Sequence, residues 1–224
     1  MDQASKIQST VNLLGYDILP NVLTAAEVQD LIHALGRPEG AGIRGVLDIP
    51  LVAALAVSSR IMDLVSACIP GTPRAVRTIY FDKSSDTNWS VGWHQDVTLA
   101  VKAKEDVPGF GQWSIKDGVP HVQAPANLLE QMVTIRLHLD DCDETNGALR
   151  VLMGSHCFGR VTTADMKHLS LECPEYICRV PSGGALLMRP LLLHCSRRSQ
   201  DNRHRRVLHI EYAGFDLPEP LEWR

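Results

Sequence analysis

Hydrophobic periodicity divides the chain into a helical first third and a longer remainder built from short strands. Apolar residues recur at helical spacing over residues 25–35, and Thr24 with Glu27 forms a capping box where that stripe begins. A wider apolar stripe over residues 51–69 predicts a second helix, and residues 15–20 predict a short strand before both. We therefore expect the first third of the chain to supply helices that cover one face of a sheet.

Short β segments begin near residue 74 and recur through the rest of the chain. The pattern predicts strands at residues 75–81, 93–100, 132–140, 149–152, 176–180, 184–189, 191–194 and 205–212. The dipeptide Asn146-Gly147 is typical of a hairpin turn. Residues 102–125 are rich in Gly and Pro, and a connection of that length inside a compact domain is usually functional. We favour a lid for residues 102–125 over a loop packed on its own side chains or a disordered segment.

Two of the predicted strands separate apolar from polar side chains by face. On the strand at 132–140, the polar face carries Thr134, Arg136 and His138, and the strand at 205–212 alternates in the same way. A polar face points inward in a barrel whose interior is a binding cavity. The predicted fold class is therefore mainly β with flanking α, a jelly-roll (cupin-like) barrel buttressed by N-terminal helices.

Length and composition narrow the class of protein. A chain of 224 residues suits a single domain, 1–224, which we divide into a helical support at 1–73 and a barrel core at 74–224. The net charge of −4 gives no general reason to bind nucleic acid or an anionic membrane, and the longest apolar run, 51–57, is too short to span a bilayer. The six cysteines have no C-x-x-C spacing, and the first ten residues lack the apolar run of a signal peptide. We expect free thiols and a cytoplasmic location.

Candidate chemistry is concentrated in Trp93-His94-Gln95-Asp96. Residues two apart on a strand share a face, so one metal ion can take His94 and Asp96 together. A third ligand must come from far along the chain, and His194 ends one of the predicted strands. Two His and one carboxylate on one face of an octahedron make the facial triad of non-haem Fe(II) oxygenases, which leaves positions open for a co-substrate and oxygen.

The order and spacing of several motifs resemble the phytanoyl-CoA dioxygenase family. These motifs are Trp93-His94-Gln95-Asp96, Leu139-Asp140-Asp141, Asn146-Gly147-Ala148-Leu149-Arg150-Val151, Gly154-Ser155-His156, His194-x-Ser196 and Arg205-Arg206. The resemblance extends from the first long strand to the C-terminus and implies a double-stranded β-helix. The chain departs from the family pattern at Met153, where Pro is common, and it is short for the family.

The resemblance implies a role for each matched residue. His94, Asp96 and His194 would bind Fe(II), and Arg205 and Ser196 would hold the distal carboxylate of 2-oxoglutarate. The planar guanidinium of Arg suits a carboxylate. Further co-substrate contacts are expected at Thr78, Thr134 and Arg136. The implied reaction uses O2 to hydroxylate a small-molecule metabolite, with release of succinate and CO2.

Several alternatives stay open at this point. Substrate contacts are expected from four residues that the predicted barrel points toward its cavity or places on the long connection: Trp113, His121, His138 and His209. A basic cluster could favour an anionic substrate, and with the net charge of −4 we rank nucleic acid low. It consists of Arg197, Arg198, Arg203, Arg205 and Arg206. The same centre could catalyse desaturation, cyclisation or epimerisation, or serve a binding protein without turnover. A zinc hydrolase is disfavoured because such sites more often use three His, or His with Glu.

Overall fold

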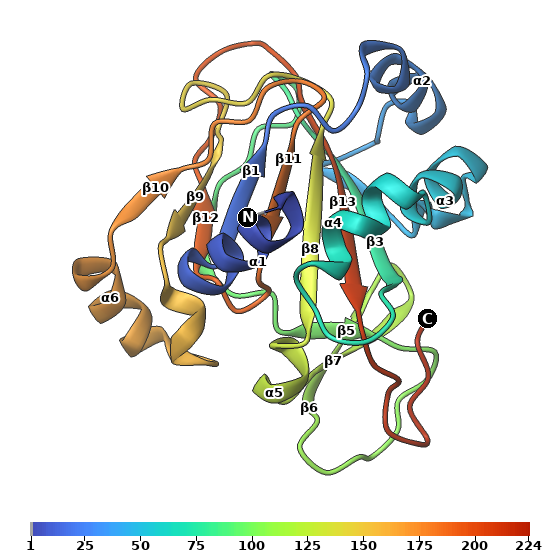
Figure 1. Ribbon diagram of the computed structural model, residues 1–224, viewed down its shortest axis with the longest axis vertical. Helices are drawn as coiled ribbons and strands as arrows, with labels where there is room; N and C mark the ends of the chain where they lie inside the picture. Colours follow the sequence, from blue (N-terminus) through green and yellow to red (C-terminus); the bar gives the residue numbers. More distant parts are fainter. Residues whose placement is uncertain (1) are drawn as a thin grey trace.

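The structure is a computed structural model that describes residues 2–224, and Figure 1 shows the arrangement of its elements. The helices are α1 (Gln3–Leu14), α2 (Ala25–Leu35), η1 (Val46–Asp48), α3 (Pro50–Ala56), α4 (Ser59–Ser66), α5 (Ala126–Leu129), η2 (Ser155–Phe158) and α6 (Thr163–Glu172). The strands are β1 (Tyr16–Leu19), β2 (Gly42–Arg44), β3 (Arg74–Lys83), β4 (Val91–His94), β5 (Thr98–Ala100), β6 (Gly111–Lys116), β7 (Val119–Gln123), β8 (Met132–His138), β9 (Leu149–Leu152), β10 (Glu175–Ile177), β11 (Ala185–Met188), β12 (His194–Ser196) and β13 (Arg205–Ala213).

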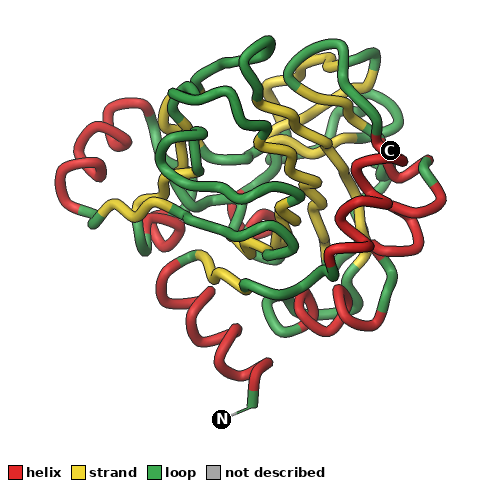
Figure 2. Tube along the Cα trace, turned by 90° about the horizontal axis from the view of Figure 1, so that it is seen from above, coloured by secondary structure: helices red, strands yellow, loops and turns green. Residues whose placement is uncertain are grey.

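The strands form three sheets whose pairings are all antiparallel. A large sheet has the order β1-β11-β8-β13-β3-β2, and a smaller one has the order β10-β9-β12-β4. Residues of both sheets line one cavity, so the two sheets face each other across it. A third sheet, β5-β7-β6, lies at one end of the large sheet (Figure 1). Helices lie at the periphery and strands nearer the middle when the molecule is seen from above (Figure 2). The predicted fold class, mainly β with flanking helices, is confirmed.

The large sheet presents an apolar face to the N-terminal helices and a polar face to the cavity. Leu31 of α2 and Ile61 of α4 are buried in one apolar cluster with Ile135 of β8 and Ile210 of β13. The polar face of β8 is equally buried: Thr134, Arg136 and His138 are at most 6% exposed. The predicted inward direction of the polar face is therefore correct. The helix at 25–35 also begins as predicted, with Thr24 and Glu27 in a capping box.

The helix predicted over 51–69 is wrong, because two helices, α3 and α4, occupy that range. Ser58 stands between them as the N-cap of α4, and its hydroxyl donates to the Leu55 carbonyl at 2.7 Å. Both helices bury an apolar side against the same cluster, so their apolar positions resemble one continuous helical stripe in the sequence. The buried positions change phase at the break: Val52 and Ala56 are four residues apart, whereas Ile61 follows Ala56 by five.

The strand predicted over 93–100 is also wrong, because it is interrupted after His94. The strand β4 pairs with β12 in the four-stranded sheet, whereas β5 pairs with β7 in the third sheet. The chain changes sheets between the two strands, so residues 95–97 are coil. His94 and Asp96 therefore do not share the face of one strand.

The connection over 102–125 is not a structureless loop, since it contains the hairpin of β6 and β7. The turn is Asp117-Gly118, and both residues have positive φ, 50° and 78°. Asp-Gly is a strong signal for a two-residue hairpin turn, and it could have predicted this element. Closure of the hairpin over the site stays a prediction.

Smaller differences concern element boundaries and types. The helix α1 and the short strand β2 fall outside the predicted elements. The strand predicted at 191–194 begins at His194 instead, because the Leu192 N–H bonds back to the Arg189 carbonyl in a turn. The predicted strand at 176–180 is β10, which ends at Ile177. The turn at Asn146-Gly147 leads from β8 in one sheet to β9 in the other, so it joins no hairpin pair.

Candidate metal centre

Two imidazoles come together where β4 and β12 pair. His94 and His194 are directly opposite each other in the antiparallel register, and their ring centroids are 4.1 Å apart. Opposed residues in an antiparallel pair have neighbouring side chains on the same face, which accounts for this approach. His194 is buried, with 3% of its side chain exposed, and His94 is partly open at 37%.

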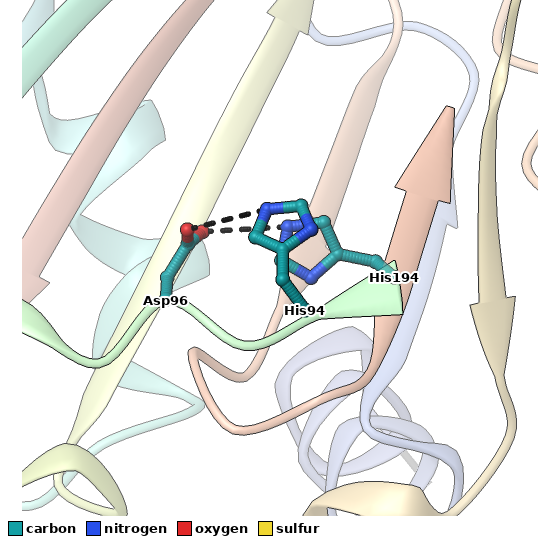
Figure 3. Close-up of side chains that lie close together, drawn as sticks. All are labelled: His94, Asp96 and His194. Carbon is teal, nitrogen blue, oxygen red and sulfur yellow. Dashed lines mark ion pairs between the residues drawn. The ribbon is translucent and has the colours of Figure 1, made fainter. Parts of the chain in front are cut away.

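A carboxylate completes the group from the coil after β4 (Figure 3). The Asp96 oxygens lie 3.9 Å from His94 Nε2 and 3.6 Å from His194 Nε2. The Asp96 N–H donates to the Pro190 carbonyl at 2.9 Å, which ties the coil to the turn before β12. The intervening Gln95 points the other way, and its amide donates to the carbonyls of Gly159 and Leu191.

The hydrogen bonds of the two imidazoles leave the correct nitrogens free for a metal. Nδ1 of His94 lies 2.9 Å from the Gly92 carbonyl, and Nδ1 of His194 lies 2.9 Å from the Leu192 carbonyl. A carbonyl only accepts, so each Nδ1 carries the proton and each Nε2 presents its lone pair toward Asp96. Ligating His residues commonly donate their second N–H to a carbonyl in this way.

Electrostatics favours the protonation states that a metal requires. Burial lowers the pKa of His194 to about 4, against the partial opposition of Asp96, so its imidazole is neutral at pH 7. Burial alone would raise the pKa of Asp96, but the facing His194, His209 and His94 outweigh it and lower that pKa. The donor atoms of His94, Asp96 and His194 lie within 4.8 Å of one another. Two imidazoles and one carboxylate fit the donor set of a non-haem Fe(II) centre.

The cavity beside this group has a cationic end. Arg205 is 3% exposed, and its guanidinium donates to the Gly147 carbonyl at 2.8 Å while its Nε has no partner in the described chain. Lys83 lies opposite Arg205 in the β3–β13 register and is fully buried. Its ammonium donates to the Arg197 carbonyl at 2.6 Å and lies 3.4 Å from Ser196 Oγ. Arg205, Ser196 and Lys83 thus form a cationic end, which we define by these three residues.

Lys83 is a residue that sequence reasoning missed. Its ammonium has no carboxylate within 4 Å among residues 2–224, and it lies 5.0 Å from the ring centroid of Trp89. Burial, with the neighbouring Arg205, lowers the pKa of Lys83 to about 7. A signal was available in the alternation of β3, because Arg77, Ile79 and Phe81 all line the triad cavity and Lys83 continues that face.

Of the three further co-substrate candidates, Arg136 and Thr134 lie on the inward face of the sheet, and Thr78 does not. Arg136 lines the triad cavity, and its guanidinium donates to His209 Nδ1 at 2.9 Å. Thr134 lies on the same inward face, and its hydroxyl is buried without a partner in the described chain. Thr78 is not brought to the triad cavity: its hydroxyl accepts the Leu47 N–H at 3.2 Å on the other face of β3. The step of one residue from Arg77 changes the face.

Of the four substrate candidates, His209 and His138 lie on the inward face of the large sheet, whereas Trp113 and His121 lie in the third sheet. His209 lines the triad cavity, and His138 is buried on the inward face of β8 with neither ring nitrogen bonded in the described chain. Trp113 packs in the apolar cluster of the third sheet, away from the triad. His121 lies on β7 and lines a second cavity, which also touches β2, η1 and β6.

In a second group of possible metal donors, Asp96, His209 and Glu211, the last two are hydrogen-bonded to each other. His209 Nε2 lies 3.1 Å from the Glu211 carboxylate, which also pairs with Arg77 at 3.1 Å. The other nitrogen of His209 accepts from Arg136. The ring nitrogens of His209 are therefore already engaged, which favours His94, Asp96 and His194 as the metal group.

The predicted basic cluster is divided between separate environments. Arg205 is buried at the cationic end, Arg206 pairs with Asp140 at 2.6 Å, and Arg203 pairs with Asp143 at 2.9 Å. These residues do not form one free surface patch.

Comparison with solved structures finds the same fold over nearly the whole chain. EctD from S. alaskensis in its apoform has a TM-score of 0.75 at 17% identity, covering 98% of this chain and 82% of that one. The non-heme alpha ketoglutarate dependent carbocyclase SnoK from nogalamycin biosynthesis has a TM-score of 0.74 at 15% identity, with 100% and 87% covered. The corresponding epimerase SnoN has a TM-score of 0.69 at 15% identity, with 93% and 81% covered. Curated protein sequences give no match.

A family model matches residues 12–207, which is most of the chain and contains the triad, Ser196 and Arg205. Its description is phytanoyl-CoA dioxygenase. No helix among residues 2–224 has the length and apolar character needed to cross a membrane. The chain belongs to the phytanoyl-CoA dioxygenase family of non-haem enzymes that depend on iron and 2-oxoglutarate.

Proposed function

We propose that this enzyme hydroxylates a small-molecule metabolite, with O2 and 2-oxoglutarate consumed and succinate and CO2 released. One observation carries the proposal. A group of two imidazoles and a carboxylate shares a cavity with Arg205 and Ser196, while Lys83 adjoins Ser196 and Arg205. One end of this arrangement suits a divalent metal, and the other suits an anionic co-substrate.

His94, Asp96 and His194 would hold Fe(II), which when bound supplies O2 activation coupled to oxidative decarboxylation of the co-substrate. The protein contributes position and protonation state. The Nδ1 bonds to Gly92 and Leu192 fix how both rings are turned. In the neutral form of each ring, these bonds place the proton on Nδ1 and leave Nε2 as the donor atom for a metal.

The cationic end would hold the distal carboxylate of 2-oxoglutarate. Arg205 offers a guanidinium whose Nε lacks a partner, Ser196 offers a hydroxyl, and Lys83 offers an ammonium. Arg136 lies on the same cavity and adds a third buried cation. Burying a positive charge without a counterion costs free energy, because the charge loses its hydration. A bound carboxylate would offset that cost by pairing with these cations.

The same site residues would serve a different oxidative outcome. Solved structures of this fold include an alpha ketoglutarate dependent epimerase and a carbocyclase, at TM-scores of 0.69 and 0.74. Epimerisation, cyclisation or desaturation of the substrate is therefore the second candidate. Incorporation of an atom of 18O2 into the product would support hydroxylation, and a product without added oxygen would support the second candidate.

We also propose that the enzyme is cytoplasmic, because all six cysteines are free in the structure and four of them are buried. Unpaired thiols in these numbers suit a reducing compartment.

The test is succinate formation from 2-oxoglutarate with Fe(II), ascorbate and O2, in the absence of substrate. Slow uncoupled turnover is expected in the wild type, and its loss is expected in His94→Ala and in Arg205→Ala. Arg198→Ala, which removes an exposed guanidinium, is the control and should match the wild type. Equal turnover in all four proteins, or unchanged 2-oxoglutarate binding in Arg205→Ala, would refute the proposal.

A further inference from the structure

A second cavity adjoins the metal centre and is not used by the chemistry above. It encloses about 220 Å³ between β3, η1 and the β6–β7 hairpin, and we call it the hairpin cavity. The strand β2 is only three residues long and pairs with β3 over residues 79–81, and the Gly45 N–H continues the pairing to the Thr78 carbonyl. Lys116 of β6 and His121 of β7 line the same cavity as Thr78.

The hairpin cavity and the triad cavity share a wall. Arg77 lines both, and its guanidinium pairs with Glu211, which belongs to the triad cavity. The triad cavity holds only about 90 Å³, whereas pockets for small ligands usually enclose about 300–1,000 Å³. A co-substrate bound at the triad would leave little room, so most of a substrate has to lie elsewhere. The hairpin cavity is the adjoining space.

One positive charge that lines the hairpin cavity has no negative partner within the described chain. Arg44 pairs with Asp117 at 2.7 Å, and Arg77 pairs with Glu211, so these four charges are matched. Lys116 donates only to the neutral Thr98 hydroxyl, at 3.2 Å, and no carboxylate of residues 2–224 lies within 4 Å of it. The lining also includes Asp48 and Arg224, which are both exposed and are screened by solvent.

A buried histidine offers a second contact in the same cavity. His121 is 2% exposed, and its Nδ1 lies 3.0 Å from the Val119 carbonyl, to which it donates. Its Nε2 is buried and has no partner within the described chain. A buried polar atom without a partner is uncommon in a folded protein, and here a bound hydroxyl would satisfy it. The hairpin cavity is therefore lined by an ammonium without a carboxylate partner and by a buried imidazole whose Nε2 has no partner within the described chain.

We propose that the substrate carries an acidic group, a carboxylate or a phosphate, which binds in the hairpin cavity against Lys116. His121 Nε2 accepts a hydrogen bond from an O–H on or beside that group. The remainder of the substrate passes Arg77 to reach the metal centre, so Lys116 and His121 select the substrate class at a distance from the chemistry. The inference rests on the proposed oxygenase function, but the binding site itself is defined without the metal.

The test follows two anions by NMR in 15N-labelled protein loaded with Zn(II), as a diamagnetic substitute for iron, and with 2-oxoglutarate. Inorganic phosphate and acetate are titrated separately, and the amide shifts of residues 111–123 are recorded. Saturable shifts in the hairpin are expected with at least one anion, and the stronger of the two identifies the acidic group. Lys116→Met should weaken this binding about tenfold or more, because a charge-assisted contact is lost.

Two variants separate a specific contact from a general loss of structure. Lys116→Arg keeps the positive charge and should retain binding, and Lys167→Met removes an exposed lysine on α6 and should match the wild type. Absence of hairpin shifts with both anions would overturn the inference, and so would binding that persists unchanged in Lys116→Met. Amide shifts near Gly147 on addition of 2-oxoglutarate report the co-substrate separately. Their absence alongside hairpin shifts would refute the proposed function and leave the anion site standing.

Discussion

At the scale of single residues, Lys83 is the side chain whose placement most needs a ligand to explain it. It is completely buried, and its ammonium contacts a hydroxyl and a carbonyl but no carboxylate within the described chain. Burying an ammonium without a counterion costs free energy of folding, which a structural role would not require. Lys83 lies beside Arg205 and Ser196, so under the proposed function its counterion is the distal carboxylate of 2-oxoglutarate.

Replacement of Lys83 by Met should therefore weaken 2-oxoglutarate binding without weakening metal binding. A hydrogen bond to a charged group contributes about 1.5–3 kcal/mol, which corresponds to a loss of about tenfold to a hundredfold in affinity. Calorimetric titration of 2-oxoglutarate into the Mn(II)-loaded protein measures this loss. Lys102→Met, which removes an exposed lysine paired with Glu222, is the control. An unchanged dissociation constant in Lys83→Met would remove Lys83 from the co-substrate site.

The same lysine predicts how stability depends on pH in the absence of ligands. Burial and the nearby Arg205 lower the pKa of Lys83 to about 7 in the folded state, from an ordinary value of 10.5. Between these two values the unfolded chain binds a proton that the folded chain has released. The free energy of unfolding should therefore rise with pH in that window, with a contribution of up to about 1.4 kcal/mol per pH unit. Urea unfolding at pH 7, 8 and 9 should show this rise in the wild type and a smaller one in Lys83→Met.

The sequence predicts that His94, Asp96 and His194 come together, but it predicts the directions of neighbouring side chains less well, for a physical reason. His94, Asp96 and His194 belong to a motif whose residue types and order are specific to one chemistry. Lys83 and Thr78 depend instead on which face of β3 each side chain takes, and a strand changes face at every residue. Only the pairing of β3 with β13 places Lys83 inward and Thr78 outward.

At the scale of elements, the coil between β4 and β5 determines where Asp96 lies. The chain leaves one sheet at His94 and joins another at Thr98, so the carboxylate is held by a coil and not by a strand ladder. Gln95 secures this coil: its amide donates to Gly159 and Leu191, and its carbonyl accepts the Val161 N–H at 3.0 Å. The glutamine thereby links the metal centre to η2 and to the turn before β12.

Gln95→Leu should lower both stability and Fe(II) affinity, although Gln95 would not touch the metal. The change leaves two carbonyls and one N–H without their partner, which costs about 1–3 kcal/mol in free energy of unfolding. Groups that position ligands typically contribute about tenfold or more to metal affinity. Denaturant unfolding and anaerobic Fe(II) titration measure the two effects. Gln131→Leu, at the surface after α5, should change neither, and a wild-type Fe(II) affinity in Gln95→Leu would contradict the positioning role.

Elements with a strong local signal are predicted, and elements defined by distant partners are not. The helix at 25–35 has both an apolar stripe and a capping box, and it begins where predicted. The division of 91–100 into β4 and β5 has no local signal, because it follows from pairing with β12 and β7. The β6–β7 hairpin is a third case: Asp117-Gly118 is a local turn signal, but it lies among Gly and Pro residues that are also typical of irregular loops.

At the scale of the whole molecule, the site joins segments that are far apart in the chain. The metal group takes its residues from β4, from the following coil and from β12, and the cationic end takes its residues from β3, β12 and β13. Unfolding separates these segments, so the unfolded chain cannot assemble either site. A ligand that binds only the folded state raises the free energy of unfolding by an amount set by its concentration relative to its dissociation constant.

Metal and co-substrate should therefore each raise the Tm of the protein, and each rise should depend on the residues of its own site. A ligand at one hundred times its dissociation constant adds about 2.7 kcal/mol, which for a chain of this size raises Tm by about 5–10 °C. Calorimetric scans of the wild type should show one such rise with Mn(II) and a further rise with 2-oxoglutarate. Arg205→Ala should retain the first rise and lose most of the second, whereas His94→Ala should lose most of the first. Chelation with EDTA should reverse the metal-dependent rise. A second rise of wild-type size in Arg205→Ala would mean that the co-substrate binds away from the cationic end.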